Sequence, residues 1–250
     1  AISVEIVTND GRTVSGQAVG YDNESGFGLV QAASPLKVRP LQLGSAATIK
    51  AGDPVLAASW GGVSGLSGVH VVAKREFAAS WEYLLDEAIF TAPPHPAWSG
   101  AALIGHDGKL LGVGSLALSD VSGNGEGNSG NMFVPIDPLM PILADLISDG
   151  RRAVSHPWLG LSTNEIDGQL VVGRVTPGAP AEKAGVRRGD IILGVNGETP
   201  KNLADFYRKI WALGQAGTDV PLEVLQKPQR RDLLIHSINR LDDLKLDNSL

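Results

Sequence analysis

The first half of the chain is a succession of short apolar segments separated by turns. Hydrophobic and polar residues alternate in Ile2–Val7, as in a strand with one buried face, and Asn9–Arg12 then has the composition of a hairpin turn. Asp107-Gly108 predicts another hairpin. The segments predicted as strands are Ile2–Val7, Thr13–Tyr21, Gly28–Gln31, Val55–Ser59, Gly68–Arg75, Ala88–Thr91, Ala101–Ile104, Lys109–Leu116 and Met132–Ile136. Such a series predicts an all-β barrel or sandwich.

The pattern changes at Asp137. Apolar residues then recur three and four positions apart, which predicts a helix with Pro138 at its first position and its end at Gly150. The short polar segment Arg151–Pro157 follows, and we interpret it as a linker between domains.

The second half has a different order of elements. The predicted strands are Trp158–Ser162, Leu170–Val175, Asp190–Val195, Asp219–Leu225 and Asp232–Ile238, and the predicted helices are Ala179–Ala184 and Asn202–Leu213. Together they make about 80 residues, the size of a small independent domain. The acidic tail Leu241–Leu250 is predicted to fray.

Composition narrows the classes of function. The chain has 250 residues, 43% of them hydrophobic, a net charge of −6 and no cysteine. It can therefore build packed cores, and it lacks the basic surface that binding to nucleic acid requires. Disulfides, thiolate zinc sites and cysteine nucleophiles are excluded. No apolar stretch is long enough to span a membrane. No metal or cofactor is expected, because the usual metal-binding and phosphate-binding motifs are absent.

A series of motifs after residue 157 carries a resemblance. They are Trp158–Leu161, Val175–Ala181, Ala184–Val186, Gly189–Ile192 and Val195–Gly197. In this order they resemble the PDZ domain of HtrA (Deg) proteases. The resemblance implies that a peptide adds as a strand to a sheet edge and that backbone N–H groups hold its terminal carboxylate.

The resemblance also implies which residues bind the peptide. Trp158, Leu159, Gly160 and Leu161 would form the loop that holds the carboxylate, with Gly160 allowing the close approach of the backbone. The segment Leu161–Thr163 would be the strand that pairs with the peptide. Phe206 and Ile210 on the second predicted helix would line the side-chain pocket; the alternative is that both belong to the core of the domain.

The first 150 residues resemble the trypsin-like domain of the same family. The motifs are Gly11-Arg12, Val19–Asp22, Leu41–Ser45, Gly52–Ala57, Ser67–Val69, Trp98–Gly100, Asp107–Val113 and Phe133–Pro135. The implied fold is mainly β: a chymotrypsin-like double β-barrel with an incomplete first barrel (1–150), an α+β PDZ domain (157–240) and a tail (241–250). Residues 1–45 hold only about three predicted strands, too few to close a barrel.

Two serines compete for the position of the nucleophile. Gly127–Gly130 matches the nucleophile motif of the family literally, but Ser129 lies in a Ser/Gly/Asn-rich run that predicts a surface loop. Ser99 is followed by the strand, turn and strand that this fold requires. In the resemblance Ser99 is therefore the nucleophile position and Ala97 the oxyanion-hole position. Because the family has glycine at the latter, we expect strain or misalignment at Ala97.

The partners of this serine are incomplete. The family's histidine comes before the segment that resembles Ala1–Tyr21, and none of the five histidines stands there. His95, in the same loop as Ser99, is a local substitute or else a solvent-facing loop residue. The orienting aspartate of the family falls on Gly26, which has no side chain, and Asp22 and Glu24 are expected to serve the turn instead.

Three functions remain open at this point. The first is a catalytically impaired HtrA-like protein that binds peptide C-termini or unfolded protein segments. The second is a serine endopeptidase with Ser99 as nucleophile and its histidine upstream of Ala1. The third is a structural scaffold. Gly26 favours the first. The resemblance alone implies a periplasmic or otherwise extracytoplasmic setting and is compatible with a homo-oligomer.

Overall fold

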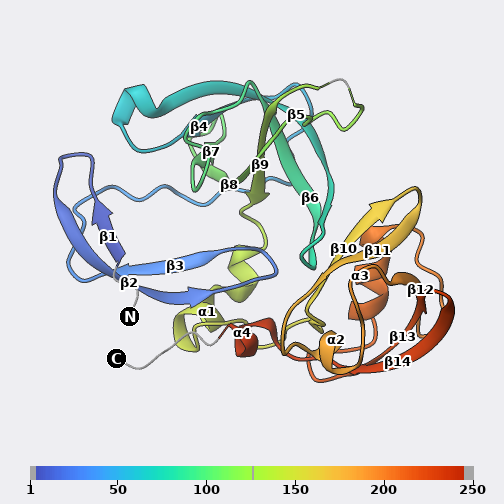
Figure 1. Ribbon diagram of the computed structural model, residues 1–250. Helices are drawn as coiled ribbons and strands as arrows, with labels where there is room; N and C mark the ends of the chain where they lie inside the picture. The colour runs from blue at the N-terminus through green and yellow to red at the C-terminus, as the bar shows by residue number, and fades with distance from the viewer. Residues whose placement is uncertain (1–3, 126, 245–250) are drawn as a thin grey trace. The chain divides into compact units, whose positions relative to one another are not determined.

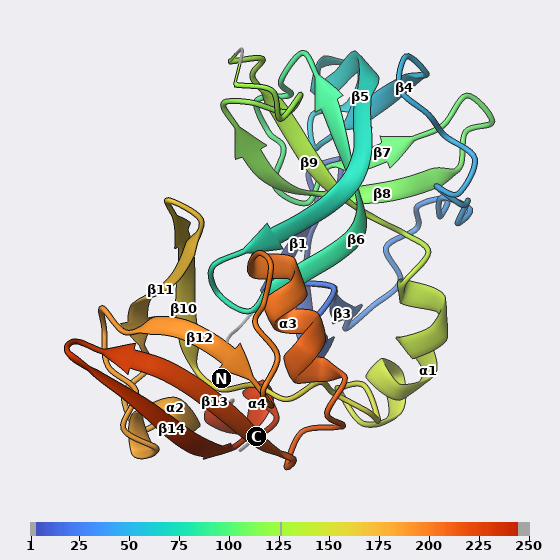
Figure 2. The same cartoon turned by 90° about the vertical axis from the view of Figure 1, so that its right-hand side faces the viewer.

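The computed structural model describes residues 4–125 and 127–244. The chain divides into two compact units (Figures 1 and 2). One, here the barrel unit, comprises Ile2–Glu76 and Leu85–Arg152. The other, here the C-terminal unit, comprises Ala153–Leu250 together with the short segment Phe77–Leu84. The fold is mainly β, as the sequence predicts.

A closed six-stranded barrel dominates the barrel unit, with its strands in the order β4-β5-β6-β9-β8-β7. The strands of this unit are β1 (Val4–Val7), β2 (Thr13–Tyr21), β3 (Gly28–Ala32), β4 (Pro54–Ala58), β5 (Leu66–Ala79), β6 (Tyr83–Ala92), β7 (Ala102–Ile104), β8 (Leu110–Leu118) and β9 (Gly130–Pro135). A short 3-10 helix spans Gly62–Gly65, and helix α1 spans Leu139–Ser148. Small and branched apolar side chains such as Ala57, Val71 and Leu103 form the core of the barrel and are completely buried.

The first three strands form a separate antiparallel sheet, in the order β1-β2-β3. As predicted, they do not close a barrel. The segment that follows them attaches to the six-stranded barrel, where Gly44 and Leu110 are joined by a backbone hydrogen bond of 2.9 Å. Helix α1 lies against β2: the N–H of Tyr21 donates to the carbonyl of Gly150 at 2.9 Å.

A five-stranded antiparallel sheet forms the centre of the C-terminal unit, in the order β10-β11-β12-β13-β14. Its strands are β10 (Leu161–Ile166), β11 (Gln169–Val175), β12 (Ile191–Val195), β13 (Asp219–Gln226) and β14 (Gln229–His236), and its helices are α2 (Pro180–Lys183), α3 (Leu203–Trp211) and α4 (Arg240–Asp243). Strand β10 begins at Leu161, not at Trp158 as predicted. The reason is that residues 159–161 turn their amides toward a side chain, described below.

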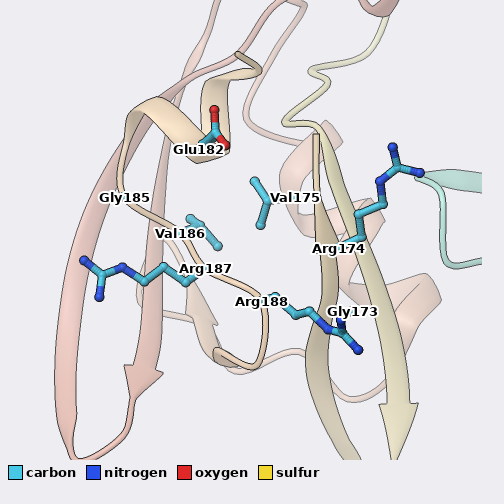
Figure 3. Close-up of a pocket in the computed structure, with 8 residues that line it drawn as sticks. All are labelled: Gly173, Arg174, Val175, Glu182, Gly185, Val186, Arg187 and Arg188. Carbon is cyan, nitrogen blue, oxygen red and sulfur yellow. The ribbon is translucent and has the colours of Figure 1, made fainter. Parts of the chain in front are cut away.

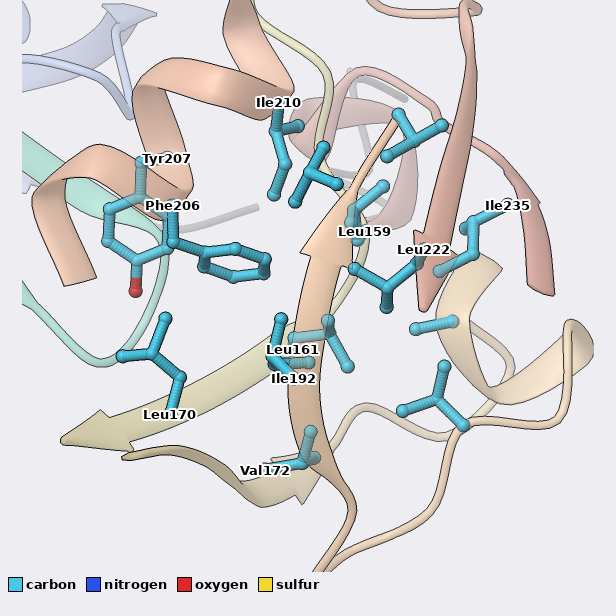
Figure 4. Packing of buried hydrophobic residues seen from close by; sticks show 14 of the residues in the cluster. Leu159, Leu161, Leu170, Val172, Ile192, Phe206, Tyr207, Ile210, Leu222 and Ile235 are labelled. Carbon is cyan, nitrogen blue, oxygen red and sulfur yellow. The ribbon is translucent and has the colours of Figure 1, made fainter. Parts of the chain in front are cut away.

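Helix α3 covers one face of this sheet through an apolar stripe. Figure 4 shows Phe206 and Ile210 pointing toward Leu159, Ile192 and Leu222. The helix begins after Asn202, the first residue of the predicted range, and this residue caps it: the side chain of Asn202 accepts a hydrogen bond from the N–H of Asp205 at 2.8 Å. The apolar stripe of the predicted helix is thus the face that packs in the core.

The hairpin β5–β6 is much longer than the sequence predicts. Its strands reach Ala79 and start again at Tyr83, whereas the predicted strands end at Arg75 and begin at Ala88. The turn contains no glycine, proline, asparagine or aspartate, so the strongest turn signals are missing.

At the C-terminal end of the chain, the predicted tail begins inside α4, and its last six residues lie outside the described residues.

Candidate functional site

Ser99 lies exposed on a loop that is fixed to the barrel by its backbone. The N–H of Gly100 donates to the carbonyl of Gly114 at 2.9 Å, and the N–H of Ala101 donates to that of Trp98 at 3.0 Å. Gly114 permits this approach, because a Cβ there would lie 1.9 Å from the Trp98 oxygen. Within the described part of the chain, no side chain makes a hydrogen bond with the Ser99 hydroxyl.

Two residues of the loop that carries Ser99, Ala97 and His95, were candidates for roles beside it. Ala97 is exposed and is not among the residues with positive φ, so the backbone strain expected there is not present. His95 is buried, which corrects the solvent-facing alternative. Its Nδ1 lies 2.8 Å from the hydroxyl of Ser67, and its backbone N–H donates to Oδ1 of Asn131 at 2.6 Å. His95 thus pairs with Ser67 in this structure.

Gly26, at the position of the orienting aspartate, closes a tight turn. Its φ is 82°, in the left-handed region, and its N–H donates to the carbonyl of Asp22 at 2.7 Å. The nearby carboxylates are held by Arg152. The Asp22 carboxylate is fully buried and accepts a hydrogen bond from Nη2 of Arg152 at 3.0 Å. The Nε atom of Arg152 forms an ion pair with the other Asp22 oxygen at 2.8 Å, and Glu24 pairs with the same guanidinium. These two carboxylates therefore serve the turn and its contact with Arg152.

Ser129 belongs to a surface loop, as predicted from its composition. The side chain is exposed and precedes β9 directly. Within the loop, the Asp120 carboxylate accepts hydrogen bonds from the N–H groups of Gly123 and Gly125 at 2.9 and 2.7 Å. These bonds organise the loop through its own backbone.

The predicted carboxylate loop of the C-terminal unit does hold a carboxylate, and it belongs to Glu82. The N–H of Leu159 donates to Oε2 of Glu82 at 2.9 Å, and the N–H groups of Gly160 and Leu161 both donate to Oε1 at 2.7 Å. Trp158 lies just outside this group and pairs with Ile238 through two backbone hydrogen bonds of 3.1 and 3.2 Å. Trp158 thus supports the loop instead of donating to the carboxylate.

Gly160 is required for a reason that the sequence does not reveal. Its φ is 81°, and a Cβ at this position would lie 2.3 Å from the Cβ of Ala179. The residue is therefore forced by the turn and by close packing against the segment before α2. The amide of Gly160 can converge with its neighbours because the turn brings the backbone into this conformation.

Strand β10 is an edge of the sheet, and its free side is engaged by the same segment as the loop. The N–H of Thr163 donates to the carbonyl of Ser80 at 2.9 Å, and Thr163 is fully buried. Tyr207 of α3 also contacts this segment. Its hydroxyl donates to the carbonyl of Ala79 at 2.7 Å and accepts from the N–H of Glu82 at 3.2 Å.

Phe206 and Ile210 lie in the core of the C-terminal unit. Their exposed fractions are 0% and 1%, and they share a cluster with Leu159 and Leu161 (Figure 4). Leu84 belongs to the same cluster. Leu84 comes from the same hairpin as Glu82. The space beside α3 and β10 is thus filled by this hairpin, and the core alternative describes both residues as they stand here.

Burial governs the ionisation of Glu82. Its side chain has left water, which raises its pKa to about 7 even though three amide donors and the charge of Arg240 act in the opposite direction. The same surroundings raise the pKa of the Tyr207 hydroxyl. A carboxyl group that changes charge near neutrality is therefore placed on the predicted carboxylate loop.

A surface hollow of the C-terminal unit lies between β11 and the segment that contains α2. It is lined by Gly173, Arg174, Val175, Glu182, Gly185, Val186, Arg187 and Arg188. Figure 3 shows that the three guanidinium groups point in different directions and do not converge. Glu182 also accepts a hydrogen bond from the N–H of Gly178 at 2.7 Å. We assign no ligand to this hollow.

Two kinds of feature are absent from residues 4–125 and 127–244. This part of the chain contains no group of three or more histidine, aspartate or glutamate side chains placed to hold a metal ion. It also contains no helix with the length and apolar character needed to cross a bilayer.

Each half of the chain matches a known family of protein domains. Residues 1–113 match the model of a trypsin-like peptidase domain, and residues 171–225 match that of a PDZ domain. The serine protease PepD of Mycobacterium tuberculosis is 30% identical over 80% of this chain and 46% of its own length. The periplasmic pH-dependent serine endoprotease DegQ of Escherichia coli is 27% identical over 90% of this chain and 51% of its own. The chain thus spans about half the length of these relatives.

Solved structures show the same fold. The HtrA-type protease AlgW with a decapeptide aligns with a TM-score of 0.61 and 20% identity, over 95% of this chain and 75% of that one. The two family models follow one another in the order that the sequence motifs predict, and the relatives match across both. This chain thus has a trypsin-like peptidase domain followed by a PDZ domain, and over most of its length it is similar to HtrA-type proteases.

Proposed function

We propose that this chain binds peptide C-termini or exposed segments of unfolded proteins at the loop Leu159–Leu161 and the edge strand β10, and that it does not cleave them. The observation that carries the binding site is the convergence of three backbone N–H groups on one carboxylate. A sheet edge beside such a group of amides is the arrangement by which a terminal carboxylate and an added strand are recognised together.

The choice of ligand follows from the residues around the loop. Main-chain pairing along Leu161–Thr163 would set the direction of the peptide, and the apolar residues Phe206 and Ile210 would favour a hydrophobic side chain at its end. The solved AlgW structure, similar in fold, contains a decapeptide, which is consistent with this class of ligand. Binding in the micromolar range, roughly, is expected because ordering a short peptide consumes much of the contact energy.

The absence of cleavage is proposed on the basis of Gly26. A histidine base works only when a carboxylate fixes its orientation and tautomer, and Gly26 offers none. Asp22 and Glu24 do not replace it, since both are paired with Arg152. Ala97 and Trp98 stand where the family has glycine and asparagine next to the serine.

The second candidate is a serine endopeptidase with Ser99 as nucleophile. Its support is that Ser99 is exposed on a loop fixed to the barrel and that the relatives are named as proteases. It requires a histidine upstream of Ala1 and an orienting group other than the residue at position 26.

Active-site labelling separates the two candidates. We expect the protein to show no detectable turnover of casein and little labelling of Ser99 by a fluorophosphonate probe, because Gly26 leaves a histidine base without its orienting carboxylate. The controls are Ser99→Ala and Ser129→Ala. Labelling that disappears in Ser99→Ala and persists in Ser129→Ala would contradict the non-cleaving proposal and establish the endopeptidase.

The setting of the protein is a further part of the proposal. An extracytoplasmic, periplasmic location is supported by the relatives that are named periplasmic. Self-association into a homo-oligomer is proposed from the family resemblance, and light scattering of the purified protein would show whether it occurs.

A further inference from the structure

The carboxylate loop is already filled by a residue of this chain. Glu82 uses both carboxylate oxygens to accept the three N–H groups of Leu159, Gly160 and Leu161, with N···O distances of 2.7 to 2.9 Å. The side chain is 92% buried, since its exposed fraction is 8%. An incoming carboxylate would therefore find these donors taken and shielded from water.

The backbone before Glu82 also occupies the place of a peptide. The carbonyl of Ser80 accepts the N–H of Thr163 on the edge strand at 2.9 Å. Ser80 lies two residues before Glu82, and Thr163 lies two residues after Leu161, so the two contacts have matching spacing along both segments. Residues 80–82 thus copy the end of a bound peptide, with a side-chain carboxylate in place of the terminal one.

Glu82 adopts a backbone conformation that glutamate seldom occupies. Its φ is 59°, in the left-handed region, at the turn of the β5–β6 hairpin where glycine or asparagine is usual. The residue there is thus unfavourable for the turn itself. Its contacts with the three amides and with the Tyr207 hydroxyl compensate for this cost.

We infer that Glu82 is an internal competitor for the peptide site, and that a partner's free C-terminal carboxylate binds by displacing it. This inference rests on the proposed peptide-binding function and adds its regulation. A site that is free for only a fraction of the time binds its ligand more weakly by that fraction. Removing the Glu82 carboxylate should therefore tighten peptide binding.

The test measures binding of a library of fluorescent peptides with randomised hydrophobic C-terminal residues to the full chain. Each peptide is used with a free and with an amidated C-terminus. The variants are Glu82→Ala, Glu82→Gln and the control Glu87→Gln. Glu87 lies on β6, five residues after Glu82, and its side chain is 65% exposed. Thermal melting followed by circular dichroism checks that each variant is folded.

Glu82→Ala is expected to bind free-acid peptides about tenfold or more tightly than the unmodified protein does. Glu82→Gln should lie between the two, because its amide group keeps one acceptor oxygen but turns donor protons toward a donor of the loop. Glu87→Gln should behave as the unmodified protein. Amidated peptides should gain nothing, since the gain depends on a second carboxylate.

Two further outcomes would overturn the inference and differ in their meaning. Equal affinity of free-acid peptides for the unmodified protein and for both Glu82 variants would show that Glu82 does not compete, and peptide binding would stand. No carboxylate-dependent binding in any folded variant would remove the proposed function, and the inference with it.

Amide hydrogen exchange supplies an independent readout of the internal contact. The N–H groups of Leu159, Gly160 and Leu161 should exchange slowly in the unmodified protein, faster in Glu82→Ala, and slowly again after free-acid peptide is added. Equal exchange in the unmodified protein and in Glu82→Ala would contradict the internal occupancy, whatever the peptides do.

Discussion

At the scale of single residues, the Glu82 carboxylate accepts hydrogen bonds from the backbone of Leu159, Gly160 and Leu161. Its contacts to the loop join residues almost 80 positions apart in the sequence, and its turn, Ser80–Glu82, has no glycine, proline, asparagine or aspartate. Ser99 and Gly26 could be placed from local motifs, whereas Glu82 could not, because nothing near it in the sequence marks it. The only available signal is a glutamate among apolar residues between two strands.

Glu82 should make stability depend on pH. Its pKa is raised from 4.5 to about 7 in the folded state, mainly by burial. The loop amides and the charge of Arg240 act in the opposite direction, and the titratable hydroxyl of Tyr207 lies nearby. Below the unfolded pKa the Glu82 carboxyl is neutral in both states and its contribution to stability is complete. That contribution is lost as the pH rises through about 7, by up to about 3 kcal/mol.

Urea unfolding near pH 4 and near pH 8 measures this loss, with Glu82→Gln as the reference, since glutamine does not ionise. The unmodified protein should lose up to about 3 kcal/mol relative to the variant between the two pH values. If the difference in unfolding free energy between the two proteins is the same at both pH values, the carboxyl group does not titrate as described.

At the scale of elements, most strands and helices could be predicted, and the errors have physical causes. Helix α3 lies within the predicted helix Asn202–Leu213, whose apolar residues fall on one stripe, and β13 and β14 lie where two strands are predicted. The extent of β5 and β6 was missed because the turn between them has a glutamate at the left-handed position. The predicted start of β10 was wrong. Residues 158–160 have the apolar composition of a strand, but the amides of Leu159 and Gly160 bind a side chain and do not pair with a neighbouring strand.

The loop and the segment before α2 should be coupled through Gly160. Gly160→Ala introduces a Cβ at φ 81° and places it 2.3 Å from the Cβ of Ala179. Gly168→Ala is the matched control, because Gly168 has φ 73° and open space around its Cβ position. The control should lose about 1 kcal/mol of unfolding free energy. Gly160→Ala should lose about 1–3 kcal/mol more.

Equilibrium unfolding in urea gives both values. Equal losses would mean that the contact with Ala179 relaxes at no cost, and that Gly160 is required by its backbone angle alone. A larger loss in Gly168→Ala would contradict the packing described for this loop.

At the scale of the whole molecule, the sequence could predict the domain order and the family but not the state of the peptide site. Motifs such as Trp158–Leu161 and Gly189–Ile192 are local, so they identify the PDZ domain directly. The role of Phe206 and Ile210 depends on what lies beside α3, and there the hairpin residue Leu84 packs in the same cluster. Contacts between distant segments decide this, and a single sequence does not contain them.

The central claim is that Leu159, Gly160 and Leu161 form a binding site for a peptide's terminal carboxylate. The most direct measurement is a titration of the isotope-labelled full chain, followed by the backbone amide resonances of these three residues in NMR spectra. We predict that free-acid peptides from the hydrophobic library shift all three resonances together with that of Thr163, and that the amidated forms leave them unchanged. Equal shifts with both forms, or shifts confined to residues elsewhere in the chain, would contradict the account.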